Sequence, residues 1–407
     1  MSNSNWPKHK LSSLTSRIGD GIHGTPIYVE RSDFSFINGN NLKDGFIEVT
    51  VDTKKVSPSE YQKHFIEFDD KTLFLSINGT LGSLAKYRGE AVILGKSAAY
   101  IKCSSINSDY LYYYFHLGSI QEYLWNVATG STIKNLSLAA IRNLEIPTPS
   151  EEEQKKIALV LSTIDAKIQC NNKINKKLES MAKQLYDYWF IQFDFPDKNG
   201  RPYKSSGGAM VFNDVLKRDI PAGWKIKHLS DIANITMGTS PAGKSLNQAS
   251  DGVVFFQGST DFGWQFPKVR QYTIDPIRMA KKGDILLSVR APVGDMNIAH
   301  IDCCIGRGLA ALNSKDGFDG FLFYVMQYFK TIFDRRNSEG TTFGSITKDD
   351  LHSLLLTYPD FELLKKYDEV VSKYNQIVFN RSMENDRLIQ LRDWLLPMLM
   401  NGQATVT

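Results

Sequence analysis

The sequence lacks any long apolar run. No stretch of its 407 residues approaches the ~18 consecutive apolar residues that a membrane-spanning helix needs. The N-terminal segment MSNSNWPKHKLSS is polar and lacks the apolar core of a signal peptide. We therefore expect a cytoplasmic protein that does not bind a membrane.

The sequence is also poor in cysteine. Four cysteines, without a C-x-x-C or an H-E-x-x-H motif, argue against a disulfide framework and against a zinc site. We expect all four to be small buried hydrophobic residues, namely Cys103, Cys170, Cys303 and Cys304. The composition, with 42% hydrophobic and 23% charged residues, is otherwise typical of a globular chain. A net charge of +4 permits nucleic-acid binding without requiring it.

The two halves of the chain match each other. The matched segments keep their order, and the offset between them drifts only from 212 to 210 residues, which favours a duplication over two unrelated domains of one class. In chain order they are Leu75-Ser76-Ile77 with Leu287-Ser288-Val289, Tyr110-Leu111-Tyr112-Tyr113 with Phe321-Leu322-Phe323-Tyr324, Gly130-Ser131-Thr132-Ile133 with Gly340-Thr341-Thr342-Phe343, and Leu136, Ile141 and Leu144 with Ile346, Leu351 and Leu354.

Each repeat follows the same plan. Runs typical of strands, such as LFLSI, EAVIL, DILLSV and GVVFF, alternate with glycine-rich turns. One apolar and aromatic helix is expected in each half, over residues 109–127 and 320–336. A long charged helix then follows a proline, and Ser150 with Glu153 has the spacing of a capping box at the first of these helices.

The long helices carry heptad-like seams that are apolar at their ends and polar in the middle. The first seam is Ile157, Leu161, Ile164, Ile168, Asn171, Asn175, Leu178, Ala182, Leu185 and Trp189; the second is Tyr367, Val371, Tyr374, Val378, Arg381, Asn385, Leu388, Leu391, Leu395 and Met398. Antiparallel pairing would create a pseudo-two-fold axis and bring Asn171 and Asn175 against Arg381 and Asn385 near it. Buried polar residues there would fix the register of the helices; the alternative is that these positions are splayed or exposed to solvent.

The length of these helices suggests what they could measure. A helix of ~33 residues spans ~50 Å at 1.5 Å per residue. Such a pair could hold two recognition domains about one turn of DNA apart, or somewhat more, as in dimeric DNA readers. Because the repeats are not identical, the two half-sites would differ.

The sequence closely resembles the specificity subunits of type I restriction-modification systems. Four segments carry the resemblance, in the correct order: GSTIKNLSLAAIRNLEIPTPSEEEQKKIA at 130–158, QFDFPDKNGRPYKSSGGAMV at 192–211, GWKIKHLSDIANITMGTSP at 223–241 and DWLLPMLMNGQATV at 393–406. The junction at 130–158 and the C-terminal ending are specific signals, whereas the domain interiors are not. The second junction is less typical, since Tyr358 and Asp360 stand where the first repeat has Thr148 and Ser150.

The resemblance implies an α+β fold with two α/β target recognition domains in a pseudo-two-fold arrangement. Two long helices that form an antiparallel coiled coil would separate these domains and set the gap between half-sites. The expected boundaries are 1–150 for the first recognition domain, 151–193 for the central helix, 194–359 for a linker and the second recognition domain, and 360–407 for the C-terminal helix and tail.

The resemblance also implies partners. The chain would bind double-stranded DNA at a bipartite, asymmetric site and carry two modification subunits that methylate adenine with S-adenosylmethionine. Restriction subunits would add an ATP- and Mg²⁺-dependent motor and nuclease. This chain itself would be non-catalytic and hold no cofactor or metal. In agreement, it contains no Pro-Pro pair, which the N/D-P-P-aromatic loop of adenine methyltransferases would require.

Two glycine patterns leave other readings open. Gly238 to Ser245 matches the phosphate-loop pattern G-x-x-x-x-G-K-S, so a P-loop NTPase is one alternative. The following LNQASDG is a poor helix, which favours a surface loop. Gly19, Gly21 and Gly24 form a G-x-G-x-x-G, but Thr25-Pro26 follows instead of a helix. A free-standing bipartite DNA-binding regulator is a third alternative.

Equivalent turns of the two repeats hold the candidate DNA contacts. Hydroxyl, amide and basic side chains in loops can contact phosphates and base edges. The candidates are Ser76, Asn78, Thr80, Lys96, Ser131, Thr132 and Lys134 in the first repeat and Ser288, Arg290, Arg307, Thr341 and Thr342 in the second. Asn78 and Arg290 occupy equivalent positions yet differ chemically, as expected if each repeat reads a different base. For any one of these residues, the alternative is a satisfied turn or a solvated surface.

Overall fold

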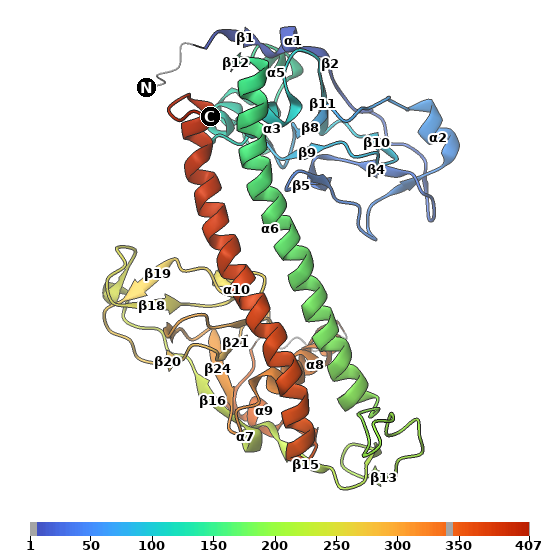
Figure 1. Cartoon of the computed structure of the whole chain (residues 1–407), viewed down its shortest axis with the longest axis vertical. Helices are drawn as coiled ribbons and strands as arrows, with labels where there is room; N and C mark the ends of the chain where they lie inside the picture. The colour runs from blue at the N-terminus through green and yellow to red at the C-terminus, as the bar shows by residue number, and fades with distance from the viewer. Residues whose placement is uncertain (1–5, 339–344, 407) are drawn as a thin grey trace. The chain divides into compact units, whose positions relative to one another are not determined.

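The computed structural model describes residues 6–338 and 345–406, with the side chains of 335–338 left out. The chain forms two compact units. The first contains residues 1–171 and 383–407, and the second contains residues 172–382. Two long helices contribute to both: α6 (Glu151–Tyr186), which continues into a π-helical turn at Asp187–Ile191, and α10 (Phe361–Met400). In each unit a part of α6 packs antiparallel against a part of α10 (Figure 1).

The first unit is built from two four-stranded sheets and a layer of short helices. One sheet has the order β2-β11-β8-β9 and the other has the order β10-β4-β7-β3. The strands are β1 (Lys8–Lys10), β2 (Thr15–Asp20), β3 (Tyr28–Val29), β4 (Ser35–Ile37), β5 (Leu42–Lys43), β6 (Phe46–Ile47), β7 (Lys55–Val56), β8 (Thr72–Ser76), β9 (Leu84–Lys86), β10 (Val92–Leu94), β11 (Ala98–Cys103) and β12 (Glu145–Pro147). The helices before α6 are α1 (Leu11–Leu14), α2 (Pro58–Lys63), α3 (Ser108–Phe115), α4 (Gly118–Val127) and α5 (Leu138–Arg142).

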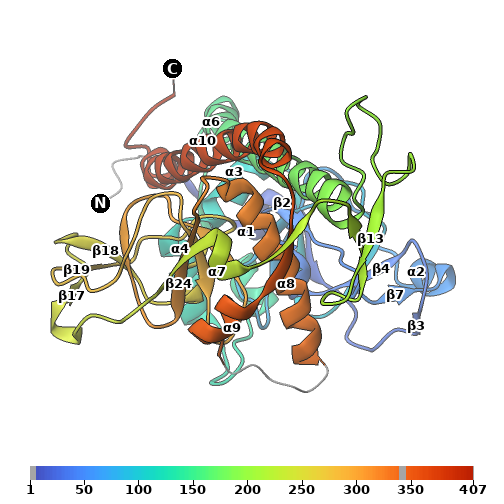
Figure 2. The ribbon, with the colours of Figure 1, turned by 90° about the horizontal axis from the view of Figure 1, so that it is seen from below.

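The second unit repeats this topology. Its sheet β16-β24-β21-β22 has the same order of equivalent strands, and a five-stranded sheet runs β17-β19-β18-β23-β20. The strands are β13 (Met210–Asn213), β14 (Arg218–Pro221), β15 (Lys225–His228), β16 (Ala233–Met237), β17 (Leu246–Asn247), β18 (Val253–Phe256), β19 (Gln271–Thr273), β20 (Met279–Ala280), β21 (Ile285–Ser288), β22 (Met296–Ile298), β23 (Cys303–Ile305), β24 (Leu309–Ser314) and β25 (Leu355–Tyr358). The shorter helices, labelled in Figure 2, are α7 (Leu229–Ile232), α8 (Asp319–Ser338) and α9 (Lys348–Ser353).

The ends of the long helices complete the cores of both units. In the first unit, Leu396, Leu399 and Met400 of α10 join the core that α3 and the sheet of β8 and β11 form. In the second unit, Ala182 and Tyr186 of α6 occupy the corresponding core. The predicted combination of two α/β domains with two long antiparallel helices is confirmed. Ser150 begins α6 as expected, because its Oγ accepts a hydrogen bond from the Glu153 N–H (3.3 Å).

Three sequence-based predictions are wrong in detail. The helix expected over 109–127 is two helices, because Leu117 is extended and the Gln121 amide caps the Phe115 carbonyl (2.7 Å). Cys170 is exposed on α6, whereas the other three cysteines are buried. Leu391 is 43% exposed, because the buried seam of α10 passes through Leu396 and Leu399 instead.

Among the helices of residues 6–338 and 345–406, none is long and apolar enough to cross a membrane.

Candidate nucleic-acid interface

The same turn follows an inner strand of the equivalent four-stranded sheet in each repeat. Ser76 and Ser288 end β8 and β21, and both are buried. The Ser76 hydroxyl donates to the Asn78 carbonyl (3.3 Å), and the Ser288 hydroxyl donates to the Arg290 carbonyl (2.8 Å). Both hydroxyls therefore lie inside their turns, and the residues two positions later form the turn surface.

Backbone hydrogen bonds close the turn in the same way in both repeats. The Gly82 N–H donates to the Ser76 carbonyl (3.0 Å), and the Gly294 N–H donates to the Ser288 carbonyl (2.9 Å). Both glycines have a positive φ, of 88° and 89°, which disfavours other residues there. The two turns are thus the same local structure.

Two further segments bind to each turn. In the first unit, the Ile77 N–H donates to the Ser97 carbonyl (2.9 Å), and the Leu136 N–H donates to the Ile77 carbonyl (2.9 Å). In the second unit, the equivalent bonds run from Val289 to Gly308 (3.0 Å) and from Ile346 to Val289 (2.8 Å). We call these segments the loop cluster. It comprises residues 76–83, 95–98 and 129–136 in the first unit, and residues 288–295, 306–309 and 345–346 in the second.

The loop cluster brings most of the predicted DNA contacts together. The exposed members are Thr80, Lys96, Ser131, Thr132, Arg290 and Arg307, and Asn78 is half-buried. The ammonium of Lys134 already has partners within the protein. Its Nζ donates to the Ala128 carbonyl (3.4 Å) and lies 5.6 Å from the centre of the Trp125 ring. Thr341 and Thr342 lie outside the described residues. In each unit the cluster thus presents at least one exposed basic side chain beside a turn.

The two glycine patterns turn out to be one structural loop, present once in each repeat. Gly21 follows β2, and Gly238 follows β16. The residue after each glycine donates its N–H to the end of an equivalent strand: Ile22 to Leu94 (2.7 Å) and Thr239 to Ile305 (3.0 Å). The sequence comparison missed this equivalence because these positions are 217 residues apart, outside the 210–212 range of the other matches.

Close packing of backbones explains why both loops need glycine. A Cβ on Gly21 would lie 1.9 Å from the Leu94 oxygen, and a Cβ on Gly238 would lie 2.2 Å from the Gly306 oxygen. Such distances are far below van der Waals contact, so only glycine fits. The glycines therefore hold these loops against the segments that carry Lys96 and Arg307.

The second of these loops does not have the structure of a phosphate-binding loop. Gly243–Ser245 forms a single 3-10 turn, and the strand β17 follows directly. A P-loop needs a helix whose N-terminus faces the phosphate. Lys244 is exposed, and Ser240 Oγ accepts a hydrogen bond from the Arg307 N–H (3.3 Å). The loop is thus an extension of the loop cluster, and Ser240 and Lys244 are further functional candidates that the sequence pattern alone did not identify.

The polar residues in the middle of the two helix seams form hydrogen bonds between α6 and α10. In the first unit, Asn171 Nδ2 donates to Asn385 Oδ1 (2.9 Å) and to Glu384 Oε2 (2.8 Å). In the second unit, Asn175 Nδ2 donates to Ser382 Oγ (3.3 Å), and Arg381 is half-buried. Asn171, Asn175 and Asn385 are 0%, 1% and 7% exposed. These amides thus lie inside the helix pair rather than in solvent.

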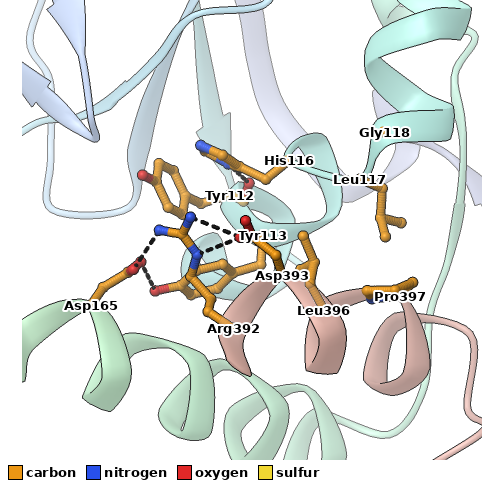
Figure 3. Close-up of a pocket in the computed structure, with 10 residues that line it drawn as sticks. All are labelled: Tyr112, Tyr113, His116, Leu117, Gly118, Asp165, Arg392, Asp393, Leu396 and Pro397. Carbon is orange, nitrogen blue, oxygen red and sulfur yellow. Dashed lines mark hydrogen bonds and ion pairs between the residues drawn. The ribbon is translucent and has the colours of Figure 1, made fainter. Parts of the chain in front are cut away.

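A second polar cluster ties α3 of the first unit to both long helices (Figure 3). Asp165 of α6 accepts hydrogen bonds from the Tyr113 hydroxyl of α3 (2.7 Å) and from Arg392 Nη1 of α10 (2.9 Å). Arg392 also bonds to its neighbour Asp393 (2.8 Å). Burial raises the pKa of Tyr113 above its usual value, so the hydroxyl keeps the proton that it donates. The cluster lines a cavity of about 370 Å³ in which the charges are already paired with one another.

We expect Arg392→Met to lower the free energy of unfolding by about 1–2 kcal/mol, because Asp165 would keep only the Tyr113 hydroxyl as a partner. The partial exposure of the guanidinium keeps the cost below that of a fully buried pair. Urea unfolding of the purified chain measures it. Arg387→Met, at an exposed arginine of the same helix, is the matched control and should change stability by less than about 0.5 kcal/mol. Equal effects of both variants would contradict the role of the cluster.

Comparison with known proteins is consistent with this geometry. The sequence profile described as "Type I restriction modification DNA specificity domain" matches residues 29–180 and 221–377. The chain is 32% identical to the putative type I restriction enzyme MjaX specificity subunit of Methanocaldococcus jannaschii, over 98% of this chain and 94% of that protein. It is 27% identical to the MjaIX specificity subunit of the same organism, over 83% and 79%. Its fold is similar to the type I restriction-modification S subunit from M. genitalium, with a TM-score of 0.64, 18% identity and coverage of 98% and 97%.

Proposed function

The chain belongs to the family of type I restriction-modification DNA specificity subunits, and we propose that each of its repeats reads one half of a bipartite, asymmetric DNA site. As a specificity subunit it is the recognition component rather than a catalytic one. The observation that carries the proposal is the loop cluster. It has the same backbone hydrogen bonds in both repeats, but different side chains at equivalent exposed positions.

The chemistry of the cluster fits two different half-sites. Arg307 in one repeat and Lys96 in the other are exposed cations at equivalent positions, suited to DNA phosphates. Asn78 and Arg290, at the turn surface, are suited to base edges: asparagine pairs best with adenine and arginine with guanine. Common phosphate contacts with unlike base contacts are what an asymmetric bipartite site requires.

We further propose that the long helices carry two modification subunits, which would hold S-adenosylmethionine, and set the gap between the half-sites. Restriction subunits with ATP and Mg²⁺ would complete the assembly, so that no cofactor is needed on this chain. Exposed apolar residues on α10 support a docking role, since such side chains favour burial against a partner. They include Val370, Ile377, Leu391 and Trp394, at 36%, 40%, 43% and 60% exposure.

The decisive experiment is to co-produce the chain with its modification subunit in a host free of adenine methylation, and to map methyladenine across the genome. The proposal expects one bipartite motif with a constant gap. Tight, sequence-specific binding by the isolated chain, together with no methylation in the presence of the partner, would favour a free-standing regulator instead.

Replacing Arg290 by glutamine should change one half of that motif and leave the other unchanged. Each base contact is worth about 1–3 kcal/mol of discrimination, so relaxed recognition at one position is the expected result. The same methyladenine map measures it. The control is Arg270→Gln, at an exposed arginine outside the loop cluster, which should leave the motif intact. An unchanged motif with Arg290→Gln would remove this residue from the set of base contacts.

A further inference from the structure

A cavity of about 420 Å³ lies in the second unit, where β22 and the start of α8 meet α10. Its apolar wall includes Phe323 and Phe379. Its polar groups include the carboxylates of Asp319 and Asp368 and the side chain of Gln265. The loop cluster contributes no residue to it, and the cavity is therefore distinct from the proposed DNA-reading surface.

Three of the polar groups that line this cavity, Asp319, Asp368 and Gln265 Oε1, are acceptors, and the donor groups of Lys282, Asn375 and Gln376 line it beside them. In the part of the chain that the structure describes, neither Asp319 nor Asp368 forms an ion pair. Burial raises the pKa of both carboxyls, and the charge of Asp319 raises the pKa of Asp368 further. Gln265 is 5% exposed, and its Oε1 has no hydrogen-bond partner among the described residues. A buried acceptor of this kind costs free energy unless a donor reaches it.

The equivalent cavity of the first unit shows what fills such a space. It has a similar volume, about 350 Å³, and its lining includes Lys86, Asp109 and Tyr112. Lys86 Nζ lies 2.5 Å from Asp109 Oδ1 and 4.3 Å from the centre of the Tyr112 ring. The first unit therefore supplies its own ammonium group to a carboxylate and an aromatic face.

The second unit lacks this lysine. Strands β9 and β22 have the same register against their neighbours: Lys86 is paired with Leu73, and Ile298 with Ile285, at the equivalent position. The position of the cationic Lys86 in the first repeat is thus occupied by Ile298 in the second. Lys282, an exposed residue, lines the cavity too, but its ammonium lies over the Phe379 ring at 4.9 Å. Among the described residues it forms no ion pair with either carboxylate.

From this comparison we propose that the cavity of the second unit binds an organic cation, an ammonium or guanidinium group on a short apolar stem. The cation would take the place that Lys86 occupies in the first unit. The carboxylates of Asp319 and Asp368 and the Gln265 oxygen would accept its N–H groups, and the aromatic wall would cover its stem. A basic side chain of a partner protein or a free polyamine could present this chemistry. The site does not depend on the proposed function.

Calorimetric titration of the full-length chain tests the proposal. The probes are butylguanidinium and butylammonium, with 1-butanol as the neutral control. We expect the cations to bind about tenfold more tightly than 1-butanol or better, and the double variant Asp319→Asn with Asp368→Asn to lose this preference. The variants keep the shape of both side chains, and circular dichroism confirms that they fold.

Two variants exchange the residue at this equivalent position between the repeats, and they serve as matched controls. Ile298→Lys should place an ammonium in the cavity and abolish cation binding. Lys86→Ile should empty the first cavity and create a second cation site, which doubles the binding stoichiometry. Equal affinity for 1-butanol and the cations, or cation binding unchanged by Ile298→Lys, would overturn the proposal.

A second titration, on the assembled complex, identifies the source of the cation. If a partner side chain fills the cavity, the assembled complex with the modification subunit should no longer bind butylguanidinium. Cation binding that persists in the complex, with spermidine competing for it, would assign the cavity to a free polyamine. Both results support a cation site.

Discussion

Replacing Gly238 by alanine should displace its loop and abolish recognition of one half-site. Gly243→Ala in the same loop should leave both the loop and the recognised half-site unchanged. A Cβ added to Gly238 would lie 2.2 Å from the Gly306 oxygen, a backbone atom that cannot move without shifting the segment of Arg307. Around Gly243 there is open space for a Cβ. We expect a loss of about 3 kcal/mol in unfolding free energy for the first variant and less than about 0.5 kcal/mol for the second.

The first repeat provides an independent copy of this experiment. Gly21→Ala should be as harmful as Gly238→Ala, because its Cβ would meet the Leu94 oxygen at 1.9 Å, while Gly24→Ala has open space. Urea unfolding gives the stabilities, and a methyladenine map shows which half of the motif is lost in each case. If Lys244 and Gly243 formed a nucleotide site instead, Gly243→Ala and Lys244→Ala would be the damaging variants. That pattern would contradict the packing role of Gly238.

The equivalence of these loops could not be predicted from the sequence. The duplication was evident because strands, turns and helix starts match at offsets of 210–212 residues. The loops after β2 and β16 match at 217, because the segments between equivalent strands differ in length. The requirement for glycine arises from contact with Leu94 and Gly306, which are remote in sequence. Local patterns resembling nucleotide-binding motifs therefore had a packing cause that only the fold reveals.

The errors on the long helices have a different cause. A strict heptad extrapolated along α10 places Leu391 in the seam, but an α-helix has 3.6 residues per turn and drifts from a 3.5-residue repeat. Near its C-terminus α10 also packs against the core of the first unit, through Leu396 and Leu399, and not only against α6. The buried face is thus set by tertiary contacts that the helix sequence does not specify.

The candidate contact residues show a similar limit. The pattern correctly grouped turns that lie together in the loop cluster, because both repeats contained the same residues in the same order. It could not separate hydroxyls that shape a turn, such as the hydrogen-bonded pair Ser76 and Thr80, from one on an exposed residue such as Ser131. Which of the exposed residues contact bases stays a prediction.

The second large effect is expected at the centre of the helix pair. Replacing Asn171 by leucine should lower the unfolding free energy by about 3 kcal/mol, because Asn385 and Glu384 would lose a donor inside the first unit. Asn385→Leu should have a similar cost. The control is Ile168→Leu, at an apolar seam position one turn away, which should cost less than about 1.5 kcal/mol.

The double variant Asn171→Leu with Asn385→Leu separates stability from register. Two facing leucines restore apolar packing, so the double variant should be more stable than either single variant, with a coupling of about 1–3 kcal/mol. Leucines at this position tolerate axial slippage that a paired amide does not. If the amide pair fixes the register that spaces the half-sites, the methyladenine map of the double variant should show motifs with more than one gap length. A stable double variant with a single, unchanged gap would mean that the packing of the helix ends in the two cores sets the register instead.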